Sequence, residues 1–149
     1  MTLKNKIVSA DEAIAIIRDG DMVCISGFVG IGTPDELILA LERRFLKERC
    51  PTGIGLMFAA APGDGKERGL NRLAHKGLLK RVVGGHWSLV PKLAELALNN
   101  EIEAYNLPLG CISRLYLCLG GIRFCVRSST RSTVRRLFKA GPKRSTRFT

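Results

Sequence analysis

The segment "SGFVGIGTPDE" combines glycines and acids at a spacing that can support chemistry. Gly27, Gly30 and Gly32 are spaced GxxGxG, the reverse of the GxGxxG dinucleotide fingerprint, and no P-loop Lys-Ser/Thr pair follows. Asp35 and Glu36 begin an expected helix, where their charges satisfy the helix dipole and would repel a phosphate. Two interpretations stay open: a tight turn whose glycines adopt positive φ, or a loop whose backbone N–H groups face a neutral or weakly anionic group, such as a thioester carbonyl.

The two histidines are the other candidates for acid–base chemistry. His86 lies in "GGHW" at the end of an expected strand, and His75 lies in an expected short helix. A lone histidine in such a place is more often a packing or polar-surface residue than a catalytic one. The five cysteines are odd in number and form no CxxC pair, so they indicate neither a disulfide framework nor a zinc site. We expect no metal and no permanently bound cofactor.

Alternating helical and strand patterns must position these groups. Helical patterns cover 9–20, 33–49, 70–79 and 88–100, and short apolar strand patterns cover 21–28, 53–61, 80–87 and 101–108. This alternation predicts an α/β fold, with an open, mostly parallel sheet, helices on both faces and right-handed crossovers. Ligands bind such sheets at the carboxyl ends of the strands, so the glycine segment, "AAAPGDG", "GGHW" and "NLPLG" are expected at one edge.

Local signals define the first two helices. Capping-box spacings, Ser9 with Glu12 and Thr33 with Glu36, mark their starts, and Pro34 occupies the favoured first helical position. The strand between them, "DMVCISGF", is short and apolar, as in a buried parallel strand. In the second helix we expect Leu37, Leu41 and Phe45 to share a buried face. We expect Arg43, Arg44 and Lys47 to face solvent.

Composition and charge divide the chain unequally. With 149 residues and 46% apolar side chains it fits one domain, and no run approaches the length of a membrane span. The N-terminus lacks the apolar core of a secretory signal, so a cytoplasmic protein without membrane contact is expected. Residues 1–110 hold 14 of the basic residues and all 13 acids, whereas 111–149 hold 10 basic residues and no acid. Residues 111–149 therefore carry +10 of the net charge of +11, and residues 1–110 are nearly neutral.

The motifs together resemble one family. "DGDMVCISGFVGIGTP" is similar to the N-terminal signature of the family I CoA-transferases, with Ser26 where Gly is usual and Cys24 within the apolar triplet. "FAAAPGDGKERGLNRLAHKGLLKRVVGGHW" and "LVPKLAELALNNEIEAYNLP" resemble the propionate and acetoacetate branch, the acyl-CoA:acetate/3-ketoacid CoA-transferases. The resemblance covers roughly residues 5–116, and we expect 1–116 to form an N-terminal, alpha-type CoA-transferase domain.

The resemblance implies a reaction and a set of site residues. Members move CoA between an acyl-CoA and a short-chain carboxylic or 3-keto acid, in short-chain fatty acid and ketone body metabolism, with the CoA thioester as substrate. They use two similar α/β domains, in one chain or two subunits, and a glutamate nucleophile that passes through an anhydride and a glutamyl-CoA thioester. The positions implied are a substrate loop of Gly27, Phe28, Val29, Gly30 and Gly32, and weaker substrate-facing positions at His86, Asn106, Leu109 and Gly110.

Two parts of the family machinery are missing from this sequence. The family's nucleophile lies in a Ser/Ala-Glu-x-Gly motif of the C-terminal domain, whereas the last acid here is Glu103. We therefore assign no catalytic residue to this chain, expect it to be inactive alone, and expect a C-terminal, beta-type domain or subunit to be required. Between Pro108 and Gly110 the family has Gln, but Leu109 stands here and cannot donate a side-chain hydrogen bond.

The segment 117–149 departs from this pattern. It is basic, rich in Arg, Ser and Thr, and shows no helical or strand period, so we expect a disordered tail. Out-of-frame translation produces such an abrupt change, and we hypothesise a frameshifted, truncated gene product, which reading the other two frames of the coding DNA past Tyr116 tests. The alternative is a non-catalytic remnant or binding module whose basic tail binds nucleic acid or another anion. The tail has no interleaved aromatics beyond Phe124, Phe138 and Phe148 and no recognised module, which disfavours nucleic acid.

Overall fold

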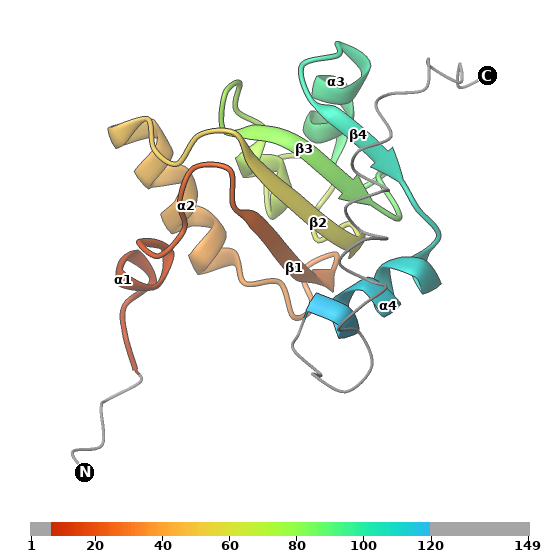
Figure 1. Ribbon diagram of the computed structural model, residues 1–149, viewed down its shortest axis with the longest axis horizontal. Helices are drawn as coiled ribbons and strands as arrows, with labels where there is room; N and C mark the ends of the chain where they lie inside the picture. Colours follow the sequence, from red (N-terminus) through yellow and green to blue (C-terminus); the bar gives the residue numbers. More distant parts are fainter. Residues whose placement is uncertain (1–6, 120–149) are drawn as a thin grey trace. The chain divides into compact units, whose positions relative to one another are not determined.

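A computed structural model describes residues 7–119 of the chain (Figure 1). The chain divides into two compact units, Met1–Ile112 and Ser113–Thr149, and the whole sheet belongs to the first. Most of the segment expected to be a disordered tail, 120–149, lies outside the described residues. Residues 117–119 are helical and end α4, so the pattern change at 117 does not coincide with the end of a helix.

Helices and strands alternate along the chain, as predicted. Their order is α1 (Ala10–Ile14), β1 (Met22–Phe28), α2 (Asp35–Glu48), β2 (Ile54–Ala60), the 3-10 helix η1 (Leu70–Leu73), β3 (Leu79–Gly84), α3 (Pro91–Leu98), β4 (Glu103–Asn106) and α4 (Leu109–Leu119). No helix among the described residues is long and apolar enough to cross a membrane.

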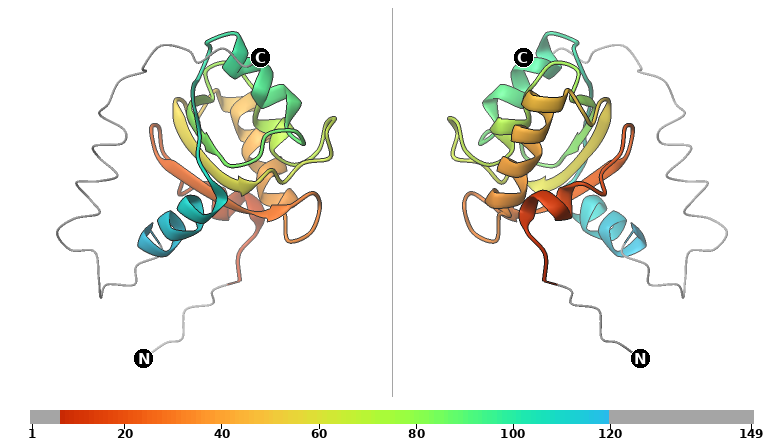
Figure 2. Two further views of the ribbon diagram at one scale, coloured as in Figure 1. Left: turned by 90° about the vertical axis from the view of Figure 1, so that its right-hand side faces the viewer. Right: turned by 90° about the vertical axis from the view of Figure 1, so that its left-hand side faces the viewer.

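The four strands form one parallel sheet in the order β1-β2-β3-β4. Parallel neighbours require crossover connections, and α2 and α3 lie on the same side of the sheet, as Figure 2 shows. The main hydrophobic core lies between this face and the helices, and it includes Phe45 of α2, Phe58 of β2, Val82 of β3 and Leu93 of α3. The predicted open α/β sheet with parallel strands is confirmed.

The opposite face of the sheet is covered near the end of β3. Side chains alternate between faces along a strand, so Gly84 and Gly85 point to opposite sides. A Cβ on Gly84 would meet Phe58 and Trp87 of the core, whereas a Cβ on Gly85 would overlap Leu109 and lie 3.2 Å from Ile112. The first turn of α4 therefore packs on the face opposite α2 and α3, and the predicted helices on both faces are present.

The prediction that 21–28 forms a buried strand is wrong about burial. Strand β1 lies at the edge of the sheet and pairs only with β2 among the described residues. Its exposed and covered residues alternate, with Ile25 buried and Met22 and Phe28 exposed. The prediction failed because an apolar run of only four residues occurs in edge strands as well as in central strands and cannot distinguish them.

The capping box predicted at Thr33 and Glu36 is also wrong. The residue preceding α2 is Pro34, rather than Thr33, and no side chain caps the helix. The Thr33 hydroxyl instead donates a hydrogen bond to the Val29 carbonyl at 3.1 Å, so it serves the preceding turn. At α1 the predicted box is confirmed, since Ser9 and Glu12 satisfy each other's backbone N–H groups. Hydrogen bonds from the Ser9 N–H and the Ser9 hydroxyl to the Glu12 carboxylate lower the pKa of Glu12.

The face predicted for α2 is partly wrong. Leu41 and Phe45 are buried as expected, but Leu37 is exposed. Arg44, which was expected to face solvent, has a side chain only 19% exposed and donates hydrogen bonds to the Ile14 and Ile17 carbonyls at 2.8 and 3.0 Å. The positive charge of Arg44 thus lies at the C-terminal end of α1, where it interacts favourably with the helix dipole.

Two predicted helices are shorter in the structure. Helix α1 ends at Ile14 rather than near Gly20, and the pattern over 70–79 forms only the 3-10 turn η1, after which β3 begins at Leu79. Gly77 adopts φ of 89°, a left-handed conformation that interrupts a helix and turns the chain into β3. Glycine inside an apolar pattern is the signal that marks this break.

Candidate functional site

All four strands run in the same direction, so their carboxyl ends meet at one edge of the sheet. Four segments follow them there: the glycine loop 27–33, the β2 loop 62–69, the β3 loop 85–90 and the start of α4 after β4. In an open parallel sheet this edge is where ligands bind. The sequence-predicted site residues are distributed over three of these segments, which follow β1, β3 and β4.

The glycine loop begins with a two-residue hairpin turn. The Phe28 N–H donates to the Ile31 carbonyl at 3.0 Å, and the Ile31 N–H donates to the Phe28 carbonyl at 2.9 Å. Val29, inside the turn, has φ of 56°, a left-handed conformation that a β-branched residue rarely adopts. Such strain persists only where the surroundings hold it, and here Thr33 holds the Val29 carbonyl.

Two of the three loop glycines are required by the backbone. Gly27 has φ of 130°, and a Cβ on it would lie 2.8 Å from the Thr33 hydroxyl. Gly32 has φ of 68° in open space, whereas Gly30 has neither a left-handed φ nor a close neighbour. The interpretation as a tight turn with positive φ therefore holds for Gly27 and Gly32, while Val29 takes the third strained position.

The same loop offers backbone donors. Among the described residues, no acceptor is found for the N–H groups of Val29, Gly30 and Gly32. The apolar side chains beside them are open to solvent, with Phe28 53% and Ile31 79% exposed. Unpaired amides next to apolar surface suit a ligand with a polarised oxygen and an apolar body. This geometry keeps the second interpretation, a loop that faces a carbonyl group, open.

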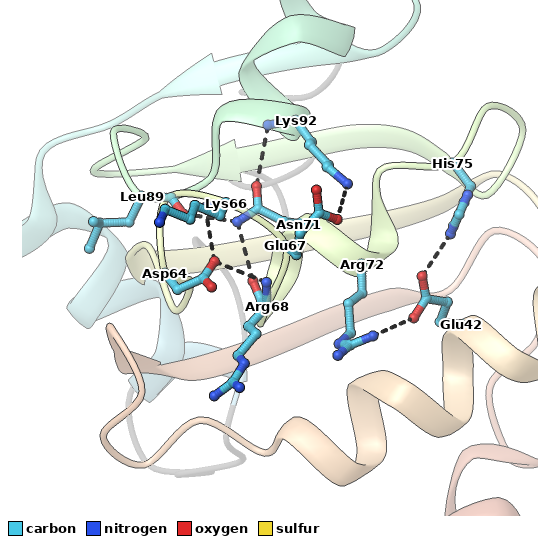
Figure 3. A network of polar contacts seen from close by, with 10 residues as sticks. All are labelled: Glu42, Asp64, Lys66, Glu67, Arg68, Asn71, Arg72, His75, Leu89 and Lys92. Atoms are coloured by element: carbon cyan, nitrogen blue, oxygen red, sulfur yellow. Dashed lines mark hydrogen bonds and ion pairs between the residues drawn. The ribbon is translucent and has the colours of Figure 1, made fainter.

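The β2 loop is organised around Asp64, at the carboxyl end of the next strand. The Asp64 carboxylate accepts hydrogen bonds from the N–H groups of Lys66 and Arg68, both at 2.9 Å, and these bonds lower the pKa of Asp64 (Figure 3). The side chain of Arg68 extends toward the start of α2, where it lines a depression together with Asp35, Glu36, Leu39 and Arg72. Two acids and two arginines balance its charge, so this depression offers no net attraction for an anion.

A buried asparagine on η1 holds this loop, and sequence reasoning missed it. Asn71 is 2% exposed, and its side-chain amide bonds to the β2 loop, the β3 loop and the first turn of α3. The available signal was a polar residue between two leucines in "LNRL". Because that pattern equally suits a surface position on a helix, it does not identify a buried residue.

The two histidines have different surroundings. His86 is exposed on the β3 loop, and its Nε2 lies 2.6 Å from the Ser88 hydroxyl. His75 lies away from the carboxyl ends of the strands, with its Nε2 3.1 Å from a Glu42 carboxylate oxygen and its ring stacked on Phe45. His75 thus joins η1 to α2, which is the packing role that is common for a lone histidine.

The residues after β4 approach the β3 loop. Asn106 is the last residue of β4 and is exposed, and Leu109 and Gly110 begin α4. The Leu109 side chain, 48% exposed, lies directly against Gly85. Leu109, at the position where the resemblance implies Gln, therefore borders the residue before His86 with an apolar side chain.

The structure brings the predicted residues together in two groups. Gly27, Phe28, Val29, Gly30 and Gly32 form one tight turn after β1. The substrate-facing positions after β3 and β4 form the second group. Because β1 and β4 are three strand spacings apart, the two strands are separated by about 14 Å. Across the described residues, no cluster of three potential metal ligands is found.

Comparisons with known proteins agree on one family. A family model described as Coenzyme A transferase matches residues 7–124. Acetate CoA-transferase YdiF from Escherichia coli K12 is 35% identical over 109 residues, 72% of this chain and 20% of the relative. Caffeate CoA-transferase from Acetobacterium woodii is 30% identical over 74% of this chain and 21% of its own length. The acetate CoA-transferase alpha subunit from Escherichia coli K12 is 25% identical over 79% of this chain and 50% of that subunit.

A solved structure gives the same result. The crystal structure of the acyl-CoA transferase YdiF from Escherichia coli O157:H7, as a thioester complex with CoA, superposes with a TM-score of 0.64 at 33% identity. The match covers 69% of this chain and 21% of the YdiF chain. The present chain thus spans about a fifth of YdiF and half of the alpha subunit.

Proposed function

Because this chain belongs to the coenzyme A transferase family, we propose that it forms part of an enzyme that moves CoA between an acyl-CoA and a short-chain carboxylic or 3-keto acid. The names of the relatives, acetate and caffeate CoA-transferases, support a carboxylic acid as the acceptor of CoA. We propose that the reaction takes place in the cytoplasm, within short-chain fatty acid or ketone body metabolism. The CoA thioester is a substrate rather than a resident cofactor.

The observation that carries this proposal is the turn after β1. It presents the unpaired N–H groups of Val29, Gly30 and Gly32 at the carboxyl edge of a parallel sheet. In our proposal, these amides donate to the carbonyl oxygen of the thioester. Negative charge develops on that oxygen when a nucleophile attacks, and preorganised backbone donors stabilise such charge more strongly in the transition state than in the ground state.

We propose that the nucleophile comes from a second domain or subunit. Its glutamate carboxylate attacks the thioester carbon, the C–S bond breaks and CoA leaves as a thiolate, giving an acyl–glutamyl anhydride. The thiolate then attacks the glutamyl carbonyl, which releases the acyl group as a carboxylate and leaves a glutamyl-CoA thioester. The acceptor carboxylate reverses both steps. No oxidant or reductant is needed.

The proposal gives Leu109 a defined effect. The leucine side chain has no hydrogen-bond donor, so at this position the chain has an apolar contact beside Gly85 instead of a side-chain amide. Orientation of the substrate oxygen then depends on the glycine loop alone. We expect a transferase built on this chain to be slower than one with Gln at position 109, and to tolerate an apolar acyl group there.

The experiment supplies the missing part. The chain is co-expressed with the remainder of Escherichia coli YdiF and incubated with acetyl-CoA, and the partner polypeptide is examined by mass spectrometry for a glutamyl-CoA thioester. We expect no acyl exchange by the chain alone and thioester formation in the mixture. Exchange by the chain alone would refute the need for a partner. A stable mixed complex that binds acetyl-CoA without forming the thioester would favour the non-catalytic alternative.

Two matched variants test the loop itself. Gly27→Ala places a methyl group against the Thr33 hydroxyl at a φ unsuited to alanine, so it should abolish thioester formation. Gly30→Ala adds the same methyl group in open space and retains the backbone N–H, so it should preserve most of the thioester formation. Equal thioester formation by the two variants would contradict the role of the turn.

A further inference from the structure

Asn71 connects two loops that follow neighbouring strands. Its Nδ2 group donates to the Arg68 carbonyl at 3.2 Å and to the Leu89 carbonyl at 3.1 Å. Its Oδ1 atom accepts the Lys92 N–H at 3.2 Å, as Figure 3 shows. Arg68 belongs to the β2 loop, Leu89 to the β3 loop and Lys92 to the first turn of α3. One buried side chain therefore contacts three segments.

Backbone contacts reinforce the same junction. The Leu89 carbonyl accepts a second hydrogen bond, from the Gly65 N–H of the β2 loop at 3.0 Å. Gly63 lies so close to this carbonyl that a Cβ would overlap it and would lie 3.1 Å from Asn71 Nδ2. At the rim, Lys92 and Glu67 form an ion pair. The β2 and β3 loops are thus in direct contact, without room for a side chain at Gly63.

Loss of the Asn71 amide would leave two backbone groups without partners. Among the described residues, no other donor is found for the Arg68 carbonyl and no other acceptor for the Lys92 N–H. Lys92 lies in the first turn of α3, where N–H groups have no partner within the helix. The two hydrogen bonds are partly buried, and a partly buried polar group costs more when unpaired than it contributes when paired. Separation of the two loops would unpair all of them together.

We propose that Asn71 is a positioning residue that joins the β2 loop and the β3 loop into one cooperative unit at the carboxyl edge of the sheet. His86 and the Asp64–Arg68 segment then keep a fixed relation, and neither loop opens without the other. The benefit of this arrangement for acyl transfer rests on the proposed function. The coupling of the loops does not, since it follows from the contacts of Asn71 and of the Leu89 carbonyl.

The wild-type chain offers a first test without any substitution. Native-state hydrogen exchange, read by mass spectrometry over a series of urea concentrations, reports the opening free energy of each segment. We expect peptides covering 62–69 and 85–92 to share one opening free energy and one dependence on urea, below those of the core strands β2 and β3. Different opening free energies for the two loops would overturn the proposal.

Asn71→Asp tests the residue itself, with Asn99→Asp as the same chemical change at an exposed site. The substitution keeps the size of the side chain but turns an oxygen toward the Arg68 and Leu89 carbonyls. We expect exchange in both loops to become at least about tenfold faster, without a matching change in β2 and β3. Trp87, the only tryptophan, lies in the β3 loop, and its quenching by acrylamide should increase in the folded protein.

The remaining outcomes decide between local and global roles. Uniformly faster exchange in loops and core strands, with unchanged Trp87 quenching, would reduce Asn71 to a contributor to stability and overturn the proposal. Faster exchange in the β2 loop alone would overturn the coupling. Lys92→Met removes the rim ion pair but keeps the backbone N–H, so exchange should stay within about twofold of the wild type. These measurements need no CoA, so their failure is distinct from failure of the transferase proposal.

Discussion

The contact between the β2 and β3 loops makes Gly63 a position where a single methyl group should have a large effect. Gly63→Ala builds a Cβ that overlaps the Leu89 carbonyl and lies 3.0 Å from a Val90 methyl group and 3.1 Å from Asn71 Nδ2. The φ of Gly63 is not left-handed, so alanine meets no backbone strain there. The predicted effect is therefore steric.

The magnitude follows from what the methyl group displaces. The Leu89 carbonyl cannot retreat without stretching its hydrogen bonds from Gly65 and Asn71, at 3.0 and 3.1 Å. Each such bond contributes about 1 kcal/mol, and overpacking in a rigid environment adds about 1–3 kcal/mol. We expect Gly63→Ala to lower the free energy of unfolding by about 3 kcal/mol, which corresponds to a fall in Tm of about 12 °C for a domain of this size.

Urea unfolding followed by far-UV circular dichroism measures this change, and Gly110→Ala is the matched control. Nothing lies within 4 Å of a Cβ on Gly110, in the first turn of α4, so alanine there should leave stability unchanged or raise it by up to about 1 kcal/mol. A loss of less than about 0.5 kcal/mol for Gly63→Ala would show that the two loops adjust freely and would refute the close contact.

Three further predictions concern separate features. Val29→Gly should raise the unfolding free energy by about 1 kcal/mol in urea titrations, because glycine accepts φ of 56° without strain, and a loss of stability would contradict strain in the turn. Glu42→Gln should lower the unfolding free energy by about 1–2 kcal/mol, because the Glu42 side chain is 15% exposed and pairs with Arg72 and His75. Its control, Glu36→Gln at an exposed ion pair, should leave the unfolding free energy nearly unchanged. Hydrogen bonds from the Lys66 and Arg68 N–H groups depress the pKa of Asp64 in the folded protein. The contribution of Asp64 to the stability of the β2 loop is therefore complete above its ordinary pKa, near pH 4, and is lost as the pH falls through its lower pKa in the folded state. Asp64→Asn should remove this part of the pH dependence of hydrogen exchange in the β2 loop. An unchanged pH dependence would contradict a stabilising role of the Asp64 carboxylate.

Much of the fold follows from local pattern. The apolar runs and the turns between them were sufficient to predict four strands and a parallel sheet, because both periodicities are local properties of the chain. Thr33 shows where this information ends: its spacing to Glu36 suits a capping box, but the hydroxyl bonds to Val29 instead. Arg44 shows the same limit, since the carbonyls that bury it belong to another helix.

The candidate site was predictable to a similar depth. The glycines of the turn after β1 are visible in the sequence, because φ values of 130° and 68° at Gly27 and Gly32 require that residue type. The left-handed Val29 is not visible, since valine disfavours that conformation and only the surrounding turn imposes it. Asn71 and Leu109 take their meaning from contacts with Leu89 and Gly85, which lie 18 and 24 positions away in the chain.

The burial of Arg44 has a consequence for the order in which the chain acquires structure. Helix α1 has five residues, too few to persist alone in water, and the carbonyl of its last residue, Ile14, is bonded to a guanidinium thirty positions later. During synthesis on a ribosome, the first helix must therefore wait for the second to emerge. Arg44→Met, a change in α2, should consequently appear as lost helicity and faster proteolysis around residues 10–17.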